Sequence, residues 1–108
     1  FGGSNAIREF VYVKDLIFII LNSLIKIKES CHMNVGSNEK IKIKDLIILI
    51  SQLTNFKKKV IFQNKIKDQS IRFADKERFN KIVNYKNKYN LESGLKETIL
   101  WYKKKLKK

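Results

Sequence analysis

The chain has 108 residues, which is enough for one small domain with a single hydrophobic core. Its apolar fraction of 44% is ordinary for a globular protein, but 24 Lys and Arg residues against 10 Asp and Glu residues give a formal net charge of +14. A single cysteine excludes an internal disulfide, and a single histidine excludes a histidine-rich metal centre.

The first predicted element is a strand over about residues 8–13, where aromatic and β-branched side chains follow one another. A strongly apolar helix is predicted over about residues 15–28, with the Asp15 carboxylate as its cap. A helix that is apolar on most sides needs cover from more than one direction, and we expect that this chain does not supply all of it. The stretch is too short to span a membrane, which takes about 20 apolar residues, so a soluble protein is expected.

A short buried strand is predicted next, over residues 31–35. Within it, Cys31 is expected to be a small buried hydrophobe and His32 a structural side chain, rather than a nucleophile or a base. The isolated cysteine fits a reduced, cytoplasmic setting. Alternating Ile and Lys at residues 40–43 indicate an extended lead-in to a second helix over about residues 44–55, whose final Asn suits a left-handed conformation.

The second half of the chain alternates short apolar runs with polar connections. We expect a strand over residues 59–63 and a polar loop over residues 64–71. Asp75 is expected to cap a short helix, and Asn90 to cap a last helix from residue 91. Short strands alternating with three to four helices indicate an α/β fold. The side chains expected to pack these last helices onto the body are Phe79, Ile82, Val83, Leu95, Ile99, Trp101, Tyr102 and Leu106.

Four motifs occur in order along the chain: GxSxxxREFxYVxDL at residues 2–16, NVGS at 34–37, IKDL at 43–46, and LESGLKET followed by WY at 91–102. Together they resemble the C-terminal part of the extended short-chain dehydrogenase/reductases, the NAD(P)-dependent epimerase/dehydratases that act on nucleotide sugars. Within this family the GDP-L-fucose synthases are the most similar. The resemblance covers essentially the whole chain.

The resemblance implies that residues 1–108 form one C-terminal substrate-binding segment with a partial Rossmann-type fold. Because the sequence starts abruptly without Met, we expect a fragment whose N-terminal Rossmann part, absent here, would bind NADP and supply the catalytic Tyr and Lys. The Tyr-x-x-x-Lys pair and the glycine-rich phosphate loop of such enzymes do not occur in this sequence. We therefore assign no catalytic, cofactor-binding or metal-binding residue to the chain, and expect enzyme activity only of a full-length protein.

With no catalytic or cofactor-binding residue assigned, the function that the sequence still supports is recognition of an anionic ligand. Arg8 follows a Gly-rich loop at the start of the first strand, and a guanidinium group can bind phosphate oxygens through two parallel hydrogen bonds. The alternative is a surface ion pair between Arg8 and Glu9 or another surface carboxylate, which would contribute little to stability. The resemblance implies that Arg8 contacts the nucleotide sugar.

Three further substrate-binding residues are implied by the resemblance. Phe1 stands where the GDP-L-fucose synthases carry a Trp, and its ring would stack on a base or a sugar. Asp68 and Arg72 match the family's Lys-Pro-Asp-Gly-x-x-Arg pattern, in which the Asp would accept hydrogen bonds from a ligand hydroxyl and the Arg would bind phosphate. Lys67 and Gln69 replace the Pro and the Gly of that pattern, and the alternative for each match is a solvated loop charge.

The leading interpretation is the nucleotide-sugar-binding part of a GDP-L-fucose synthase-like, NADP-dependent epimerase/reductase. Such an enzyme converts GDP-4-keto-6-deoxymannose to GDP-L-fucose and is expected to be a homodimer when intact. One alternative is a UDP- or dTDP-sugar epimerase or dehydratase of the same family.

A different class is a small basic nucleic-acid-binding module, which the charge supports. The sequence disfavours it, because it shows no basic stripe with interleaved aromatic residues. Lys, Ile and Asn share A/T-rich codons, so genome composition accounts for much of the charge. A degenerate remnant without activity is a third option.

Overall fold

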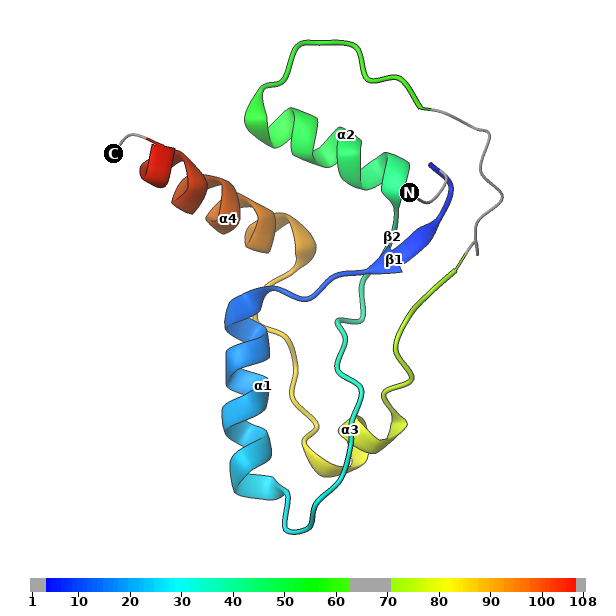
Figure 1. Ribbon diagram of the computed structural model, residues 1–108, viewed down its shortest axis with the longest axis vertical. Coiled ribbons are helices and arrows are strands. Elements are labelled where there is room, and N and C mark those ends of the chain that lie inside the picture. Colours follow the sequence, from blue (N-terminus) through cyan, green and yellow to red (C-terminus); the bar gives the residue numbers. More distant parts are fainter. Residues whose placement is uncertain (1–3, 63–70, 107–108) are drawn as a thin grey trace.

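Two short strands and four helices follow one another in the order β1, α1, β2, α2, α3, α4 in the computed structural model, which describes residues 4–62 and 71–106 (Figure 1). Strand β1 (Ile7–Glu9) pairs antiparallel with β2 (Lys40–Lys42). Helices α2 and α4 lie toward one end of the molecule and α1 and α3 toward the other, with the strands between them (Figure 1). The small sheet therefore sits where the two helical ends meet.

Strand β1 is shorter than the strand predicted over residues 8–13. The register places Glu9 opposite Lys40, which is the first residue of β2. The chain bends at Asn38, so the partner strand does not continue further along β1. Residues 10–12 therefore form a connector that leads directly into α1 (Val13–Lys26), which begins and ends two residues before the predicted helix.

The prediction that Asp15 caps α1 is wrong. Asp15 lies inside the first turn of the helix, and its side chain is fully buried. Its Oδ1 accepts hydrogen bonds from the Tyr85 hydroxyl at 3.1 Å and the Lys88 backbone N–H at 2.9 Å, and its Oδ2 accepts one from the Tyr89 backbone N–H at 3.0 Å. All three donors lie in the connector between α3 and α4, so this carboxylate fastens that connector to the start of α1. Burying a charged group requires such partners.

The predicted helix ends of α2 and α4 are confirmed. Helix α2 (Ile43–Thr54) is followed by Asn55 in the left-handed conformation, with φ of 54°. Helix α4 (Leu91–Leu106) follows Asn90, whose Oδ1 accepts the Ser93 backbone N–H at 2.8 Å. Both signals are local, because they depend only on the residues at the helix ends.

The hydrophobic core is small and lies between α1 and α3. Helix α3 (Glu77–Ile82) is short, and its N-cap residue is Lys76 rather than the predicted Asp75; the Asp75 carboxylate, one residue earlier, accepts the Glu77 backbone N–H at 3.1 Å. Phe79 and Val83 are buried against Ile19 of α1, which confirms the predicted inward face of this helix. The half-buried apolar side chains packed around this cluster are Met33, Val35, Ile82 and Tyr85.

Two predicted strands are absent from the described part of the chain. Residues 31–35 and residues 59–62 have no regular secondary structure, because neither segment has a neighbouring strand there with which to exchange hydrogen bonds. Cys31 and His32 are exposed, so the prediction that they lie in a buried strand is wrong. Most of the loop predicted over residues 64–71 lies outside the described residues.

Helix α4 extends past the body of the molecule, and its C-terminal end points outward in Figure 1. Trp101 and Tyr102 are 59% and 56% exposed, and Leu106 is exposed as well, so the prediction that they pack α4 onto the body is wrong. Helix α2, its neighbour, has 12 residues against the 16 of α4 and is too short to cover these last turns.

One face of α1 is not covered by the described chain, as its nearly continuous apolar sequence predicted. The radius of gyration is 16.6 Å, against about 13 Å for a compact domain of this length, and the shortest dimension is 19 Å. None of the described helices combines the length and apolar character needed to cross a membrane. The apolar α1 residues that are 37–83% exposed are Val13, Leu16, Ile17, Phe18, Ile20, Leu21, Leu24 and Ile25.

Candidate anion-binding pocket

Arg8 and Arg72, predicted from separate motifs, line the same pocket beside β1. The backbone N–H of Arg72 donates to the Ile7 carbonyl at 3.1 Å, and Ile7 and Ile71 form a parallel bridge. These contacts hold the chain around residue 72 against β1 and bring the two arginines together. The pocket has a volume of about 320 Å³, and its lining residues are Arg8, Glu9, Val11, Val35, Gly36, Arg72, Phe73 and Ala74.

The walls of this pocket are rich in positive charge. Arg8 is half-buried, and its Nη1 donates to the Ile7 carbonyl at 2.9 Å. A guanidinium group carries five N–H donors, so this bond is compatible with binding a phosphate. The Lys40 ammonium lies 3.5 Å from the ring centroid of Phe73, which adds a further cation near the wall.

Glu9 contributes a carboxylate to the same wall, and Lys76 neutralises it. The two side chains are 6% and 14% exposed, and Lys76 Nζ lies 2.7 Å from Glu9 Oε1. Lys76 Nζ also donates to the Ser37 carbonyl and to Asn38 Oδ1, at 2.9 Å for the latter, so its three donors are all used. Glu9 Oε2 accepts the Ala74 backbone N–H at 3.1 Å. A surface pair between Glu9 and Arg8, one form of the alternative considered from the sequence, would leave this carboxylate in solvent, whereas its side chain is 6% exposed.

Gly36 of the Asn-Val-Gly-Ser motif makes room for this ion pair. A Cβ atom at position 36 would lie 2.7 Å from the carboxyl carbon and both oxygens of Glu9, so any side chain there would force the Glu9 carboxylate out of its present position. Ser37, the next residue, is buried, and its hydroxyl accepts the Glu39 backbone N–H at 3.2 Å. The motif therefore shapes the pocket wall through the missing side chain of Gly36.

A second, apolar pocket of about 260 Å³ lies between the residue 10–12 connector, α2 and α4. Gly94 of α4 approaches Tyr12 so closely that an added Cβ would lie 3.0 Å from the Tyr12 Cβ. The Tyr12 ring packs against Tyr89 at a centroid distance of 4.7 Å. These contacts join α4 to the connector, so the pocket is a gap in the packing between elements that flank the arginine pocket.

An ion pair on the surface links α1 to α4. Lys14 Nζ lies 2.8 Å from Glu97 Oε2, joining α1 to α4. The hydrogen bond to Glu97 raises the pKa of Lys14, and the same bond lowers the pKa of Glu97. Both groups are exposed, so solvent screens the attraction between them.

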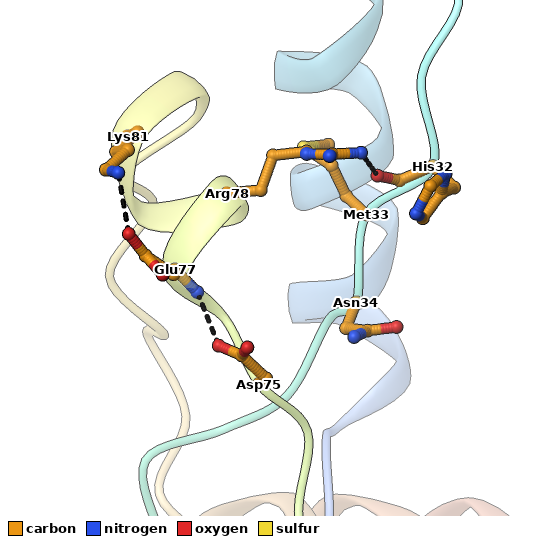
Figure 2. A pocket seen from close by; sticks show the side chains of 7 residues that line it. All are labelled: His32, Met33, Asn34, Asp75, Glu77, Arg78 and Lys81. Carbon is orange, nitrogen blue, oxygen red and sulfur yellow. Dashed lines mark hydrogen bonds and ion pairs between the residues drawn. The ribbon is translucent and has the colours of Figure 1, made fainter.

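A third pocket, of about 370 Å³, lies between the residue 31–35 segment and α3 (Figure 2). Arg78 donates to the His32 carbonyl at 2.9 Å, and Lys81 pairs with Glu77 at 2.6 Å. Because its cations and carboxylates bond within the protein, the pocket concentrates no charge of one sign for a ligand. Its lining residues are His32, Met33, Asn34, Asp75, Glu77, Arg78 and Lys81.

The structure thus brings together two of the four predicted substrate-binding residues. Arg8 and Arg72 share a pocket, whereas Phe1 and Asp68 lie outside the described residues. Sequence reasoning missed Lys76, because nothing local distinguishes it from the other lysines of the chain. Within the described ranges, no three His, Cys, Asp or Glu side chains gather closely enough to hold a metal ion.

Comparison with known proteins gives relatives in one group of enzymes, although no protein-family model matches the chain. It is 29% identical over 102 residues to a probable GDP-L-fucose synthase from Oryza sativa, which covers 94% of this chain and 31% of that protein. It is similar in structure to a UDP-glucose 4-epimerase from Thermotoga maritima, solved with UDP-glucose, with a TM-score of 0.82, 26% identity, and coverage of 98% and 34%. A dTDP-glucose 4,6-dehydratase from Bacillus anthracis in complex with NAD matches with a TM-score of 0.79, 25% identity, and coverage of 96% and 33%.

The chain spans about a third of the length of the curated relatives it matches. Its homologues and structural neighbours are NAD(P)-dependent epimerase/dehydratases, which confirms the resemblance read from the four motifs. Its helices and small two-stranded sheet have the fold of part of an extended short-chain dehydrogenase/reductase, so the α/β prediction is confirmed.

Proposed function

We propose that this chain is the nucleotide-sugar-binding part of an NAD(P)-dependent epimerase/dehydratase, and that Arg8 and Arg72 bind the diphosphate of the substrate. The observation that carries the proposal is that these two residues line one pocket beside β1. Each guanidinium group can bind a phosphate through two parallel hydrogen bonds. A volume of about 320 Å³ lies at the lower end of the range for ligand pockets, roughly 300–1,000 Å³, and suits a diphosphate rather than a whole nucleotide sugar.

The other predicted substrate contacts would extend the site beyond this pocket. Asp68 would accept a hydrogen bond from a ligand hydroxyl, and Phe1 would stack on the base or the sugar. Phe1 precedes Arg8 in the sequence, and Asp68 precedes Arg72. The arginines then fix the position of the diphosphate, and the remaining contacts select what is attached to it.

The exposed face of α1 supports docking of a second part of the enzyme. Eight apolar side chains of this helix are at least 37% exposed, and burying such a surface is the main driving force for association. We propose that a cofactor-binding Rossmann domain covers this face and supplies NADP and the catalytic Tyr and Lys. The bound cofactor would exchange a hydride with the sugar, while the residues of this chain bind and orient the substrate. The whole enzyme is expected to be a homodimer.

The sugar nucleotide proposed is the one used by a GDP-L-fucose synthase, with epimerisation of GDP-4-keto-6-deoxymannose followed by reduction to GDP-L-fucose. The identity to the Oryza protein supports this choice. A UDP- or dTDP-sugar is the alternative, which the similarity to the Thermotoga and Bacillus enzymes supports. Arg8 and Arg72 would serve each of these substrates, because all of them contain a diphosphate.

Calorimetric titration of the chain with GDP, UDP and dTDP tests the proposal. A hydrogen bond to a charged group contributes about 1.5–3 kcal/mol, so Arg8→Ala and Arg72→Ala should each weaken binding about 10- to 150-fold. Arg78→Ala is the matched control, because Arg78 donates to the His32 carbonyl in a different pocket, and it should bind as the wild type does. Unchanged affinity in the Arg8 and Arg72 variants would remove both residues from the site.

A further inference from the structure

We propose that the buried Glu9–Lys76 ion pair is the positioning element that holds Arg72 beside Arg8, and that the affinity for phosphate depends on this pair although neither residue needs to touch the ligand. The inference rests on the proposed function, because it concerns the same pocket. It assigns a role to Lys76, which no sequence motif marks.

The pair fastens three segments of the chain to one another. Lys76 Nζ bonds Glu9 of β1, the Ser37 carbonyl and the Asn38 side chain. The 36–38 turn and the residues after Arg72 are thereby tied to the strand that carries Arg8. The described residues offer the Lys76 ammonium three acceptors, which matches its three N–H donors and fixes its position.

Two hydrogen bonds set where Arg72 lies along β1. The Arg72 backbone N–H donates to the Ile7 carbonyl at 3.1 Å, and the Ala74 backbone N–H donates to Glu9 Oε2 at 3.1 Å. The Arg72 bond needs only backbone atoms, whereas the Ala74 bond needs the Glu9 carboxylate to stay in place. Lys76 holds this carboxylate by its charge, and Gly36 leaves room for it.

The pair also controls the charge of the pocket. Glu9 lines the same pocket as the two arginines, and its side chain is 6% exposed, so solvent screens its charge only weakly. An uncompensated carboxylate at this position would repel a phosphate. Lys76 cancels that charge at 2.7 Å, so the Glu9 carboxylate no longer opposes the binding of an anion.

The test measures the affinity for inorganic pyrophosphate by NMR titration, together with the melting temperature, for a set of variants of the full chain. Lys76→Met keeps an unbranched side chain but removes the ammonium, and it should bind at least tenfold more weakly than the wild type. The double variant Glu9→Gln/Lys76→Met removes both charges, and it should recover part of this loss. Ile99→Ala removes packing of a half-buried side chain on α4, a helix that contributes no lining residue to this pocket, so it should lower the melting temperature and leave the affinity unchanged.

These outcomes separate positioning from general stability. Affinity that falls with the melting temperature in all three variants alike would overturn the inference, and so would wild-type affinity in Lys76→Met. If Lys76→Met does not fold, the double variant decides, since binding equal to that of the wild type would also overturn it. Failure of the proposed function looks different: Arg8→Ala and Arg72→Ala would then bind pyrophosphate as tightly as the wild type.

Discussion

Replacing Asp15 by Asn tests how the two halves of the chain are joined. The Asp15 carboxylate is completely buried and accepts three hydrogen bonds from the connector between α3 and α4. Asn has the same size, but it replaces one acceptor oxygen by an NH₂ donor. At least one N–H or O–H of the connector would then face another donor, and the remaining bonds would lose their charge.

The magnitude follows from these contacts. Leaving a buried polar group unsatisfied costs about 1–3 kcal/mol, and the loss of charge weakens the other bonds further, so Asp15→Asn should lower the free energy of unfolding by about 2–3 kcal/mol. Asp45→Asn is the matched control, because Asp45 is the third residue of α2 just as Asp15 is the third residue of α1, but it is exposed. Asp45→Asn should lower the free energy of unfolding only by the interaction of this carboxylate with the helix dipole, about 0.3–1 kcal/mol.

Urea denaturation followed by circular dichroism measures both variants against the wild type. Asp15→Asn should shift the midpoint clearly more than Asp45→Asn. Equal shifts would mean that Asp15 acts only through its place in the first turn of the helix. The account of the connector as fastened by this carboxylate would then be refuted.

Three further predictions concern the contacts around α4 and the connector. Gly94→Ala should lower the free energy of unfolding by about 1–2 kcal/mol, because the added Cβ would crowd the Tyr12 side chain. Within a helix, Ala is normally about 1 kcal/mol more favourable than Gly, so an increased free energy of unfolding, measured by urea denaturation, would contradict this packing. Lys14→Gln should raise the pKa of Glu97 toward its ordinary value in a carboxyl NMR titration, because the hydrogen bond from Lys14 is what lowers it; an unmoved pKa would rule out the ion pair. The ion pair stabilises the fold at a pH above the ordinary Glu pKa, and this stabilisation is lost as the pH falls through the lowered pKa. Burial and then the hydrogen bond to Asp15 raise the pKa of Tyr85, so the folded state keeps the neutral hydroxyl and is stabilised by it until the pH rises past about 10. Above that pH the free energy of unfolding should fall, and in Tyr85→Phe it should fall less in alkaline denaturation curves.

Features that depend on a few adjacent residues could be predicted from the sequence. The left-handed Asn55 and the cap at Asn90 were identified because each acts on its own helix end. The excess of apolar residues in α1 predicted an uncovered face, because composition alone shows that one small domain cannot bury them all. Arg8 and Arg72 were identified from the family resemblance, and their meeting in one pocket needed the three-dimensional structure.

Features that depend on distant partners could not be predicted in this way. Asp15 has the residue type and position of a cap, and only the connector that folds back over α1 gives it three donors. Lys76 resembles the many solvated lysines of the chain until Glu9 and Ser37 surround it. Trp101 lies on an apolar helix pattern, but the neighbouring α2 is too short to cover it.

The measurement that tests the central claim most directly is a titration of the chain with GDP, followed by NMR of the arginine Nε–H groups. The sequence contains only three arginines, at positions 8, 72 and 78, so each signal can be assigned by substitution. The signals of Arg8 and Arg72 should shift together with one dissociation constant, while that of Arg78 stays in place. Signals of Arg8 and Arg72 that do not move, or that follow two different dissociation constants, would contradict the claim that both side chains bind one diphosphate.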